Sequence, residues 1–144
     1  TSSNAVVTDC YAIISSLIVY TKNTINNFGV AGGIVGGNLT NSTISNSYVV
    51  INESNSIGLT NSKFGIILGS SSPILTSGSN YNYNTYLLVK GGNYQTYGLD
   101  AKISIASSVS SKEILISTLT TSSVLQNIYK VDENNINNGY PVFK

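Results

Sequence analysis

The sequence predicts an all-β fold, a β-solenoid of about three repeated units, and two observations lead to that prediction. The first is a recurring phrase whose tyrosines, Tyr11, Tyr48 and Tyr86, lie 37 and 38 residues apart (48 − 11 and 86 − 48). A near-constant period of this size indicates one supersecondary unit repeated along an axis. The second is the abundance of Gly and Asn between the phrases, because both residues turn corners between short strands. The three phrases are TDCYAII at 8–14, SNSYVVI at 45–51 and YNTYLLV at 83–89.

The composition is that of a folded chain with few charges. Of the 144 residues, 41% are hydrophobic and only 9% are charged, against roughly 25% charged in ordinary soluble domains. This length suits a single domain with a core of its own. We therefore expect one domain over 1–144, with repeat coils over 1–98 and a short helix with a C-terminal cap over 99–144.

Each phrase is predicted to form a strand. Its apolar run, as in Tyr48–Ile51, is rich in β-branched residues and lacks the 3.6-residue stripe of a helix. The segments between the phrases carry a second recurrence, since Phe28-Gly29 and Phe64-Gly65 are 36 residues apart (64 − 28). This spacing suggests that these segments repeat with the same period as the tyrosines.

The C-terminal part departs from the repeat. Ser110 with Glu113 three residues later has capping-box spacing, so one short helix is expected over 110–119. A strand should then run through Val131, followed by an Asn-rich turn and a last strand at Tyr140–Phe143. Pro141 limits that last strand to a sheet edge or end, because proline donates no ladder hydrogen bond.

The segment GGIVGGNLTNSTISNSYVV, residues 32–50, resembles the GLUG-motif β-helical repeats of secreted and surface proteins. TDCYA at 8–12 is similar to the cysteine variant of that repeat, and the tail over 124–144 is similar to the closing segment of family members. The likeness is weaker over 61–98. It implies a right-handed parallel β-helix with a C-terminal cap, and it brings no catalytic residues.

Several kinds of chemistry have little support in this sequence. Without His, neither Ser-His-Asp or Cys-His nucleophilic schemes nor His-containing metal sites can form. No Asp-rich loop of calcium-binding spacing occurs, so neither a metal nor a cofactor is expected. A net charge of +1 argues against nucleic acid, and no apolar run reaches the roughly 20 residues of a membrane span. The acids that remain for a glycoside hydrolase or lyase are Asp9, Glu53, Asp100, Glu113, Asp132 and Glu133. Only Asp132 and Glu133 are adjacent in sequence, and they lie in a predicted turn, where exposure to solvent explains two neighbouring acids more simply than catalysis does.

Cys10, the only cysteine, stands where the other phrases have Ser47 and Thr85, so we expect a buried, unpaired thiol. Tyrosines that alternate with amide residues could form a binding or assembly face or, alternatively, a ladder that only covers the repeat. This face would comprise Tyr81, Tyr83, Tyr86, Tyr94 and Tyr97.

Three N-glycosylation sequons begin at Asn38, Asn41 and Asn52, and we expect their use if the protein passes through a eukaryotic secretory route. The chain begins at Thr1 without a basic, apolar leader, which suggests a mature or excised segment. Together with the resemblance, these features predict an extracellular or cell-surface location.

The predicted function is that of a non-catalytic extracellular structural or adhesive module of a surface protein. The alternative is a subunit of an extracellular filament that assembles end to end, because solenoid ends expose strand edges. A carbohydrate-active enzyme is a distant third. The expected partners are further copies of the chain, other surface proteins or glycans.

Overall fold

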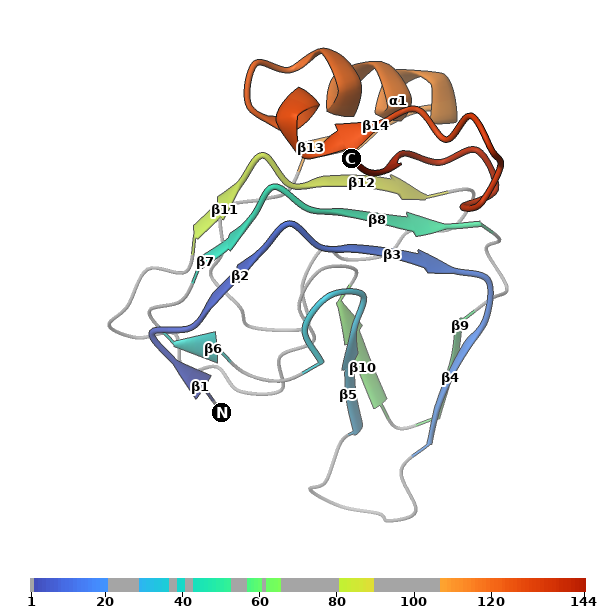
Figure 1. The fold of residues 1–144 in the computed structure, drawn as a ribbon. Helices are drawn as coiled ribbons and strands as arrows, with labels where there is room; N and C mark the ends of the chain where they lie inside the picture. Colours follow the sequence, from blue (N-terminus) through green and yellow to red (C-terminus); the bar gives the residue numbers. More distant parts are fainter. Residues whose placement is uncertain are drawn as a thin grey trace.

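The computed structural model describes residues 2–20, 29–36, 39–40, 43–52, 57–60, 62–65, 81–89 and 107–144, and everything below concerns these residues. They form short strands followed by a helical C-terminal segment (Figure 1). The strands are β1 (Ser2–Ser3), β2 (Val6–Thr8), β3 (Tyr11–Ile14), β4 (Leu17–Tyr20), β5 (Gly29–Gly32), β6 (Leu39–Thr40), β7 (Thr43–Ser45), β8 (Tyr48–Ile51), β9 (Ile57–Thr60), β10 (Ser62–Gly65), β11 (Tyr81–Tyr83), β12 (Tyr86–Val89), β13 (Ser107–Val109), β14 (Tyr129–Lys130) and β15 (Val142–Phe143). The helices are α1 (Lys112–Thr121) and the 3-10 helix η1 (Leu125–Asn127).

The repeated phrases form the largest sheet, which has the strand order β13-β12-β8-β3. Its strands are parallel, and Tyr11 pairs with Tyr48, which pairs with Tyr86. The predicted equivalence of these three tyrosines is therefore confirmed. β8 is buried on both faces, because Tyr48, Val49, Val50 and Ile51 are each 0% exposed.

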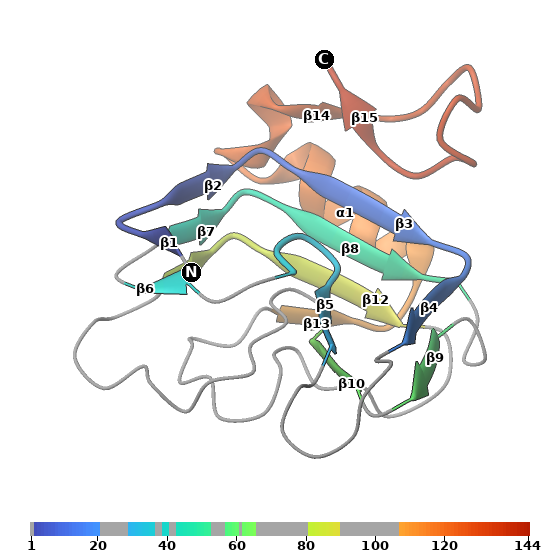
Figure 2. The same ribbon diagram turned by 90° about the horizontal axis from the view of Figure 1, so that it is seen from below.

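A sharp corner precedes each strand of this sheet. β2, β7 and β11 form a second parallel sheet that leads into β3, β8 and β12 (Figure 2). The residues at the corners, Asp9, Asn46 and Asn84, have φ of 54°, 49° and 47°. Asp and Asn are the non-glycine residues that tolerate this left-handed backbone best, which explains their recurrence in the phrase.

The expected all-β fold, a right-handed parallel β-helix of about three coils, is wrong. The described residues form a mixed arrangement of six separate sheets, five parallel and one antiparallel, together with α1 and η1. The strands have only two to four residues, and no solenoid is detected in the described ranges. The error arose because a seven-residue likeness between phrases shows that these phrases pair, and does not show that the segments between them repeat.

The offsets between paired strands show where the repeat fails. Gly29 pairs with Ser62, an offset of 33 residues, so Phe64 lies beside Ala31 and the two Phe-Gly pairs are out of register. Leu17 pairs with Ile57 at an offset of 40, and Tyr86 with Ser107 at an offset of 21. The strands on either side of the corners keep the offset of 37 or 38, as does the pair of β1 with β6.

The helix prediction is confirmed with a small shift. Ser111, and not Ser110, is the N-cap, and its Oγ accepts a hydrogen bond from the backbone N–H of Ile114 at 3.3 Å. β15 begins directly after Pro141 and pairs antiparallel with β14 alone, as expected for a strand limited by proline.

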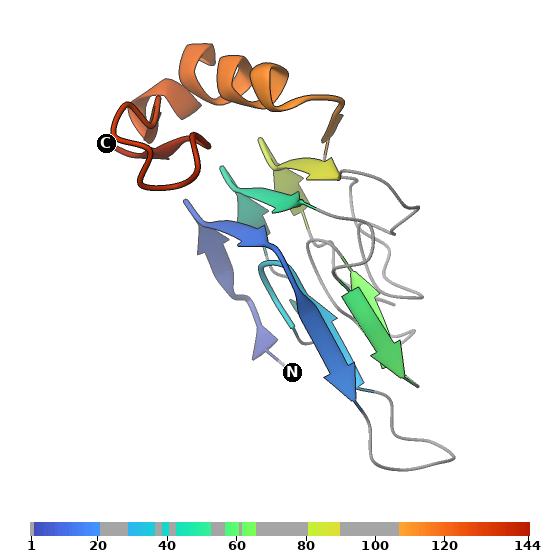
Figure 3. The ribbon, with the colours of Figure 1, turned by 90° about the vertical axis from the view of Figure 1, so that its right-hand side faces the viewer.

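The C-terminal segment, residues 111–144, lies on one face of the four-stranded sheet (Figure 3). Three of its apolar side chains, Leu115, Leu119 and Leu125, are 0% exposed and share a core with side chains from all four strands. The sheet contributes Tyr11 and Ile13 of β3, Tyr48 and Val50 of β8, Tyr86 and Leu88 of β12, and Val109 of β13. The segment therefore covers a face of the sheet and not an end of the stack.

Candidate functional site

An unpaired strand edge runs along the N-terminal side of the molecule. β2 and β3 are edge strands, paired only with β7 and β8 among the described strands. The carbonyls of Cys10 and Ile14 accept hydrogen bonds from the backbone N–H groups of Tyr48, in β8, and of Asn52, directly after it, at 3.1 Å each. Because successive residues of a strand point their backbone groups to opposite sides, those of Tyr11 and Ile13 point away from β8, toward the unpaired edge. An edge of this kind is a template for another strand.

Polar side chains form a ladder along the corners beside this edge. Asn84 Nδ2 donates to Asn46 Oδ1, and Asn46 Nδ2 donates to Asp9 Oδ1, each at 3.2 Å. Thr8 Oγ1 also donates to Asp9 Oδ1, at 2.9 Å. Asp9 and Asn84 are exposed, so these bonds lie at the surface. The ladder aligns equivalent corners and ends at the edge with a carboxylate.

Cys10 lies at the same edge and is half-buried, which corrects the expected full burial. Its equivalents Ser47 and Thr85 are 0% and 3% exposed, because each has a strand on both sides. Cys10 has a strand on one side only in the part of the chain that the structure describes. Its Sγ donates to the Thr8 carbonyl at 3.2 Å, as Ser47 Oγ does to the Ser45 carbonyl at 2.7 Å.

Two tyrosines fasten the C-terminal segment to the sheet. Tyr48 Oη donates to the Pro141 carbonyl, and Tyr129 Oη donates to the carbonyls of Asn46 at 2.7 Å and Cys10 at 3.2 Å. Tyr129 therefore ties β14 to the corners of two repeats. Burial raises the pKa of both hydroxyls, so both stay neutral donors well above pH 10.

Aromatic rings fill the space between these hydroxyls. Tyr11 stacks on Tyr48 with ring centroids 5.1 Å apart and an interplanar angle of 8°. Phe143 of β15 packs against Tyr11 at 5.0 Å and against Tyr129 at 5.4 Å. Offset and tilted aromatic pairs of this kind add stability beyond the area that they bury.

The loop between β14 and β15 is organised by one carboxylate. Asp132 is 7% exposed, and its oxygens accept three backbone N–H groups, from Ile136 at 2.8 Å, Asn137 at 2.7 Å and Gly139 at 2.9 Å. Burial alone would raise the pKa of this carboxyl, but the three N–H donors and the nearby Lys112 ammonium outweigh burial and lower it. The solvated turn expected at Asp132 is therefore wrong, whereas neighbouring Glu133 is exposed.

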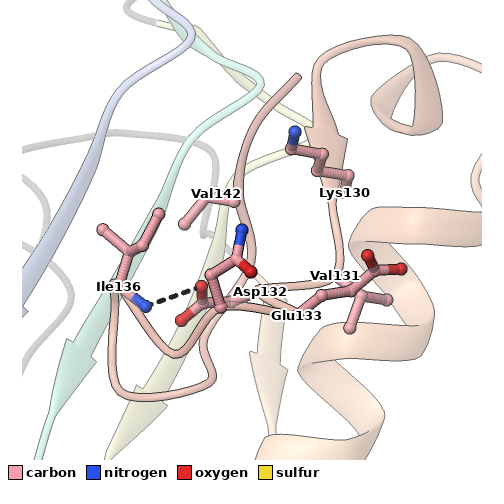
Figure 4. A pocket seen from close by; sticks show the side chains of 7 residues that line it. Lys130, Val131, Asp132, Glu133, Ile136 and Val142 are labelled. Carbon is pink, nitrogen blue, oxygen red and sulfur yellow. Dashed lines mark hydrogen bonds between the residues drawn. The ribbon is translucent and has the colours of Figure 1, made fainter.

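A hollow of about 200 Å³ lies beside this loop (Figure 4). Its size is below the roughly 300 Å³ at which ligand pockets begin. Three of its residues are apolar and at least partly exposed, and the Asp132 carboxylate beside them is already occupied by backbone donors. The residues around it are Lys130, Val131, Asp132, Glu133, Asn134, Ile136 and Val142. This hollow offers no free acid–base pair for hydrolysis.

The site residues expected from the sequence are only partly covered by the described ranges. Asn38, Asn41, Tyr94 and Tyr97 lie outside them, as do the acids Glu53 and Asp100. Tyr81 and Tyr83 lie on β11, of which the backbone alone is described, and Tyr86 packs against the core under the C-terminal segment. Asn52 is half-buried, and its Oδ1 accepts a hydrogen bond from Tyr140 Oη at 3.0 Å.

Sequence reasoning anticipated an exposed strand edge, but it missed the polar ladder and the Asp132 loop. The signal available for the ladder was the Asp or Asn that recurs two residues before each tyrosine. The signal available for the loop was the segment DENNINNG, in which an acid is followed by a run of Asn and a Gly. Within the described ranges no group of three or more His, Cys, Asp or Glu could hold a metal ion, and no helix is long and apolar enough to cross a membrane.

Comparison with known proteins identifies no relative: no protein-family model, no curated protein and no solved structure matches this chain.

Proposed function

We propose that this protein is a non-catalytic structural or adhesive module of the extracellular surface, and that it binds through the edge formed by β2 and β3. The observation that carries the proposal is this parallel edge, to which none of the described strands pairs and whose corners are aligned by the side-chain ladder. Strand addition supplies affinity through backbone hydrogen bonds and needs no catalytic group.

The charge distribution supports association at this edge. The chain has a net charge of +1 and 9% charged residues, so long-range repulsion between copies is weak. Val6 on β2 is 71% exposed and adds apolar area. Edge strands of soluble proteins are often protected by Lys, Pro or a bulge, whereas β2 and β3 contain neither Lys nor Pro.

End-to-end assembly into a filament is the second candidate, and a specific observation favours it. The C-terminal segment covers the face of the sheet from β3 to β13, where the sequence had suggested a cap that blocks one end. Both outer strands of this parallel sheet, β3 and β13, are therefore edges among the described strands. A contact between the β3 edge of one copy and the β13 edge of the next would be heterologous, so further copies could add to it and form a filament.

Light scattering on the purified chain over a range of concentrations tests the proposal, with electron microscopy to separate filaments from small assemblies. Val6→Lys places a charge beside the edge and should lower the average mass. Ile136→Lys is the matched control, because Ile136 is 78% exposed on the C-terminal loop and should leave assembly unchanged. A chain that stays monomeric at high concentration and binds no surface protein or glycan would refute both candidates.

The expected N-glycosylation has its own test. Expression through a eukaryotic secretory route should give glycans at one or more of Asn38, Asn41 and Asn52, seen as a mass shift that an N-glycan amidase removes. Unmodified asparagines in secreted material would contradict the expectation of a glycoprotein.

A further inference from the structure

We propose that Asn138 is a latent deamidation site which the Asp132 loop keeps silent, and which reacts irreversibly only during the fraction of time that this loop is open. The inference is independent of the proposed function. Asn138-Gly139 is the only Asn-Gly pair in the chain, and Gly after Asn presents the least steric obstacle to cyclisation. Asn138 is exposed, so its side chain amide is accessible to water.

The reaction is a cyclisation followed by hydrolysis. The backbone nitrogen of Gly139 attacks Cγ of Asn138, the new N–Cγ bond forms and the Cγ–Nδ2 bond breaks. Ammonia leaves with the proton that Gly139 gives up. Water then opens the cyclic imide at either carbonyl, which yields aspartate or isoaspartate at position 138. No reactant besides water is consumed.

The folded loop opposes cyclisation because it holds the nucleophile, the backbone nitrogen of Gly139, in a hydrogen bond. The Gly139 N–H donates to Asp132 Oδ2 at 2.9 Å, and the Asp132 carboxylate is only 7% exposed. Lys112 Nζ donates to the Asn138 carbonyl at 2.6 Å, so the peptide group between Asn138 and Gly139 is held from both sides. The nitrogen would have to give up its hydrogen bond before it could rotate toward the side chain.

Backbone conformation opposes the same step. Asn138 has φ of 53°, in the left-handed region where ψ is about +47°. This combination directs the Gly139 nitrogen away from the Cβ of Asn138, whereas cyclisation needs the two on the same side. Ring closure therefore requires the loop to leave its folded conformation.

The structure also explains why a labile pair stands at this position. Gly139 has φ of 71°, and a Cβ added there would lie 2.8 Å from Lys112 Nζ. A side chain at this position would be strained and would displace the Lys112 ammonium. The loop thus requires Gly139, and the hydrogen bond to Asp132 suppresses the deamidation that Gly139 would otherwise promote at Asn138.

Deamidation would prevent the loop from closing again. Isoaspartate adds one backbone atom, and either product adds a negative charge to the loop that already holds the buried Asp132 carboxylate. The same loop carries Asn137, whose Nδ2 donates to Tyr48 Oη at 3.1 Å, and Tyr140, which bonds Asn52. Modified chains should therefore hold the C-terminal segment less firmly on the sheet.

The test is peptide mapping by mass spectrometry after incubation of the whole chain at mildly alkaline pH. Native protein should gain deamidation at Asn138 slowly, and protein unfolded in urea should gain it quickly. Asp132→Asn cannot accept all three N–H groups and should accelerate the reaction in native buffer on the order of tenfold or more. The control is Glu133→Gln, which removes an exposed neighbouring charge and should behave as the native chain does.

Equal rates in native buffer and in urea would overturn the proposal, and so would a folded Asp132→Asn variant that reacts at the native rate. Circular dichroism shows whether that variant folds. If it does not, exchange of the Gly139 amide proton in the native chain decides the matter. In urea below the unfolding transition, amide exchange and deamidation must rise together, and deamidation that stays constant while exchange rises would refute the protection by Asp132.

Discussion

Replacing Tyr48 by Phe tests whether the hydroxyl beneath the C-terminal loop stabilises the fold. The ring is 0% exposed and stacks on Tyr11, so Phe keeps its packing and loses only the hydroxyl. That hydroxyl donates to the Pro141 carbonyl and accepts from Asn137 Nδ2 at 3.1 Å. Asn137 Nδ2 also bonds the Pro141 carbonyl at 3.2 Å, so this acceptor keeps one donor in the variant.

The expected loss of unfolding free energy is about 1–2 kcal/mol, the range for a buried neutral hydrogen bond whose partners stay partly satisfied. For a domain of this size, such a loss lowers Tm by roughly 2–8 °C. Tyr11→Phe is the matched control. Tyr11 is half-buried, and its hydroxyl forms no hydrogen bond with the described residues, so the change should stay within about 0.5 kcal/mol.

Urea unfolding followed by circular dichroism measures both variants. If Tyr48→Phe proves as stable as Tyr11→Phe, the Tyr48 hydroxyl does not hold the loop. A loss above about 4 kcal/mol would contradict the reasoning in the other direction, because deletion of one hydroxyl with its ring retained cannot cost that much.

Three further predictions concern the cap of α1 and the titrating groups. Ser111→Ala should cost about 1 kcal/mol in urea unfolding and Ser110→Ala close to nothing, because only Ser111 bonds the helix N-terminus. The lowered pKa of Asp132 stabilises the fold above about pH 4, and this contribution should disappear as the pH falls through the folded pKa, whereas Asp132→Asn should flatten that acid limb. The raised pKa values of Tyr48 and Tyr129 stabilise the fold fully below about pH 10, and this contribution should be lost as the pH rises toward the pKa values of the folded state. Tyrosinate absorbance should show that these two hydroxyls ionise only when the protein unfolds at alkaline pH.

The repeated phrase specifies how three of the four strands of the central sheet, β3, β8 and β12, pair with one another. Equivalent residues stack directly upon one another in parallel strands, so a phrase that recurs at a near-constant interval specifies its own register. Tyr11, Tyr48 and Tyr86 confirm this, and so do the left-handed corners at Asp9 and Asn46, where few residues are tolerated. The helix was also predictable, because capping and apolar periodicity are local properties.

The other features of the fold could not be predicted, because they depend on contacts between segments that are distant in sequence. The offset of 33 residues between β5 and β10 follows from the lengths of the connections, which no local phrase encodes. Likewise, the C-terminal helix and the NNGYPVFK tail were expected to cap one end of a stack, yet residues 111–144 cover the apolar side chains that all four strands present on one face. Asp132 shows the same limit: an acid in an Asn-rich turn is predicted to be solvated, and it is buried because folding brings three backbone N–H groups to a single carboxylate.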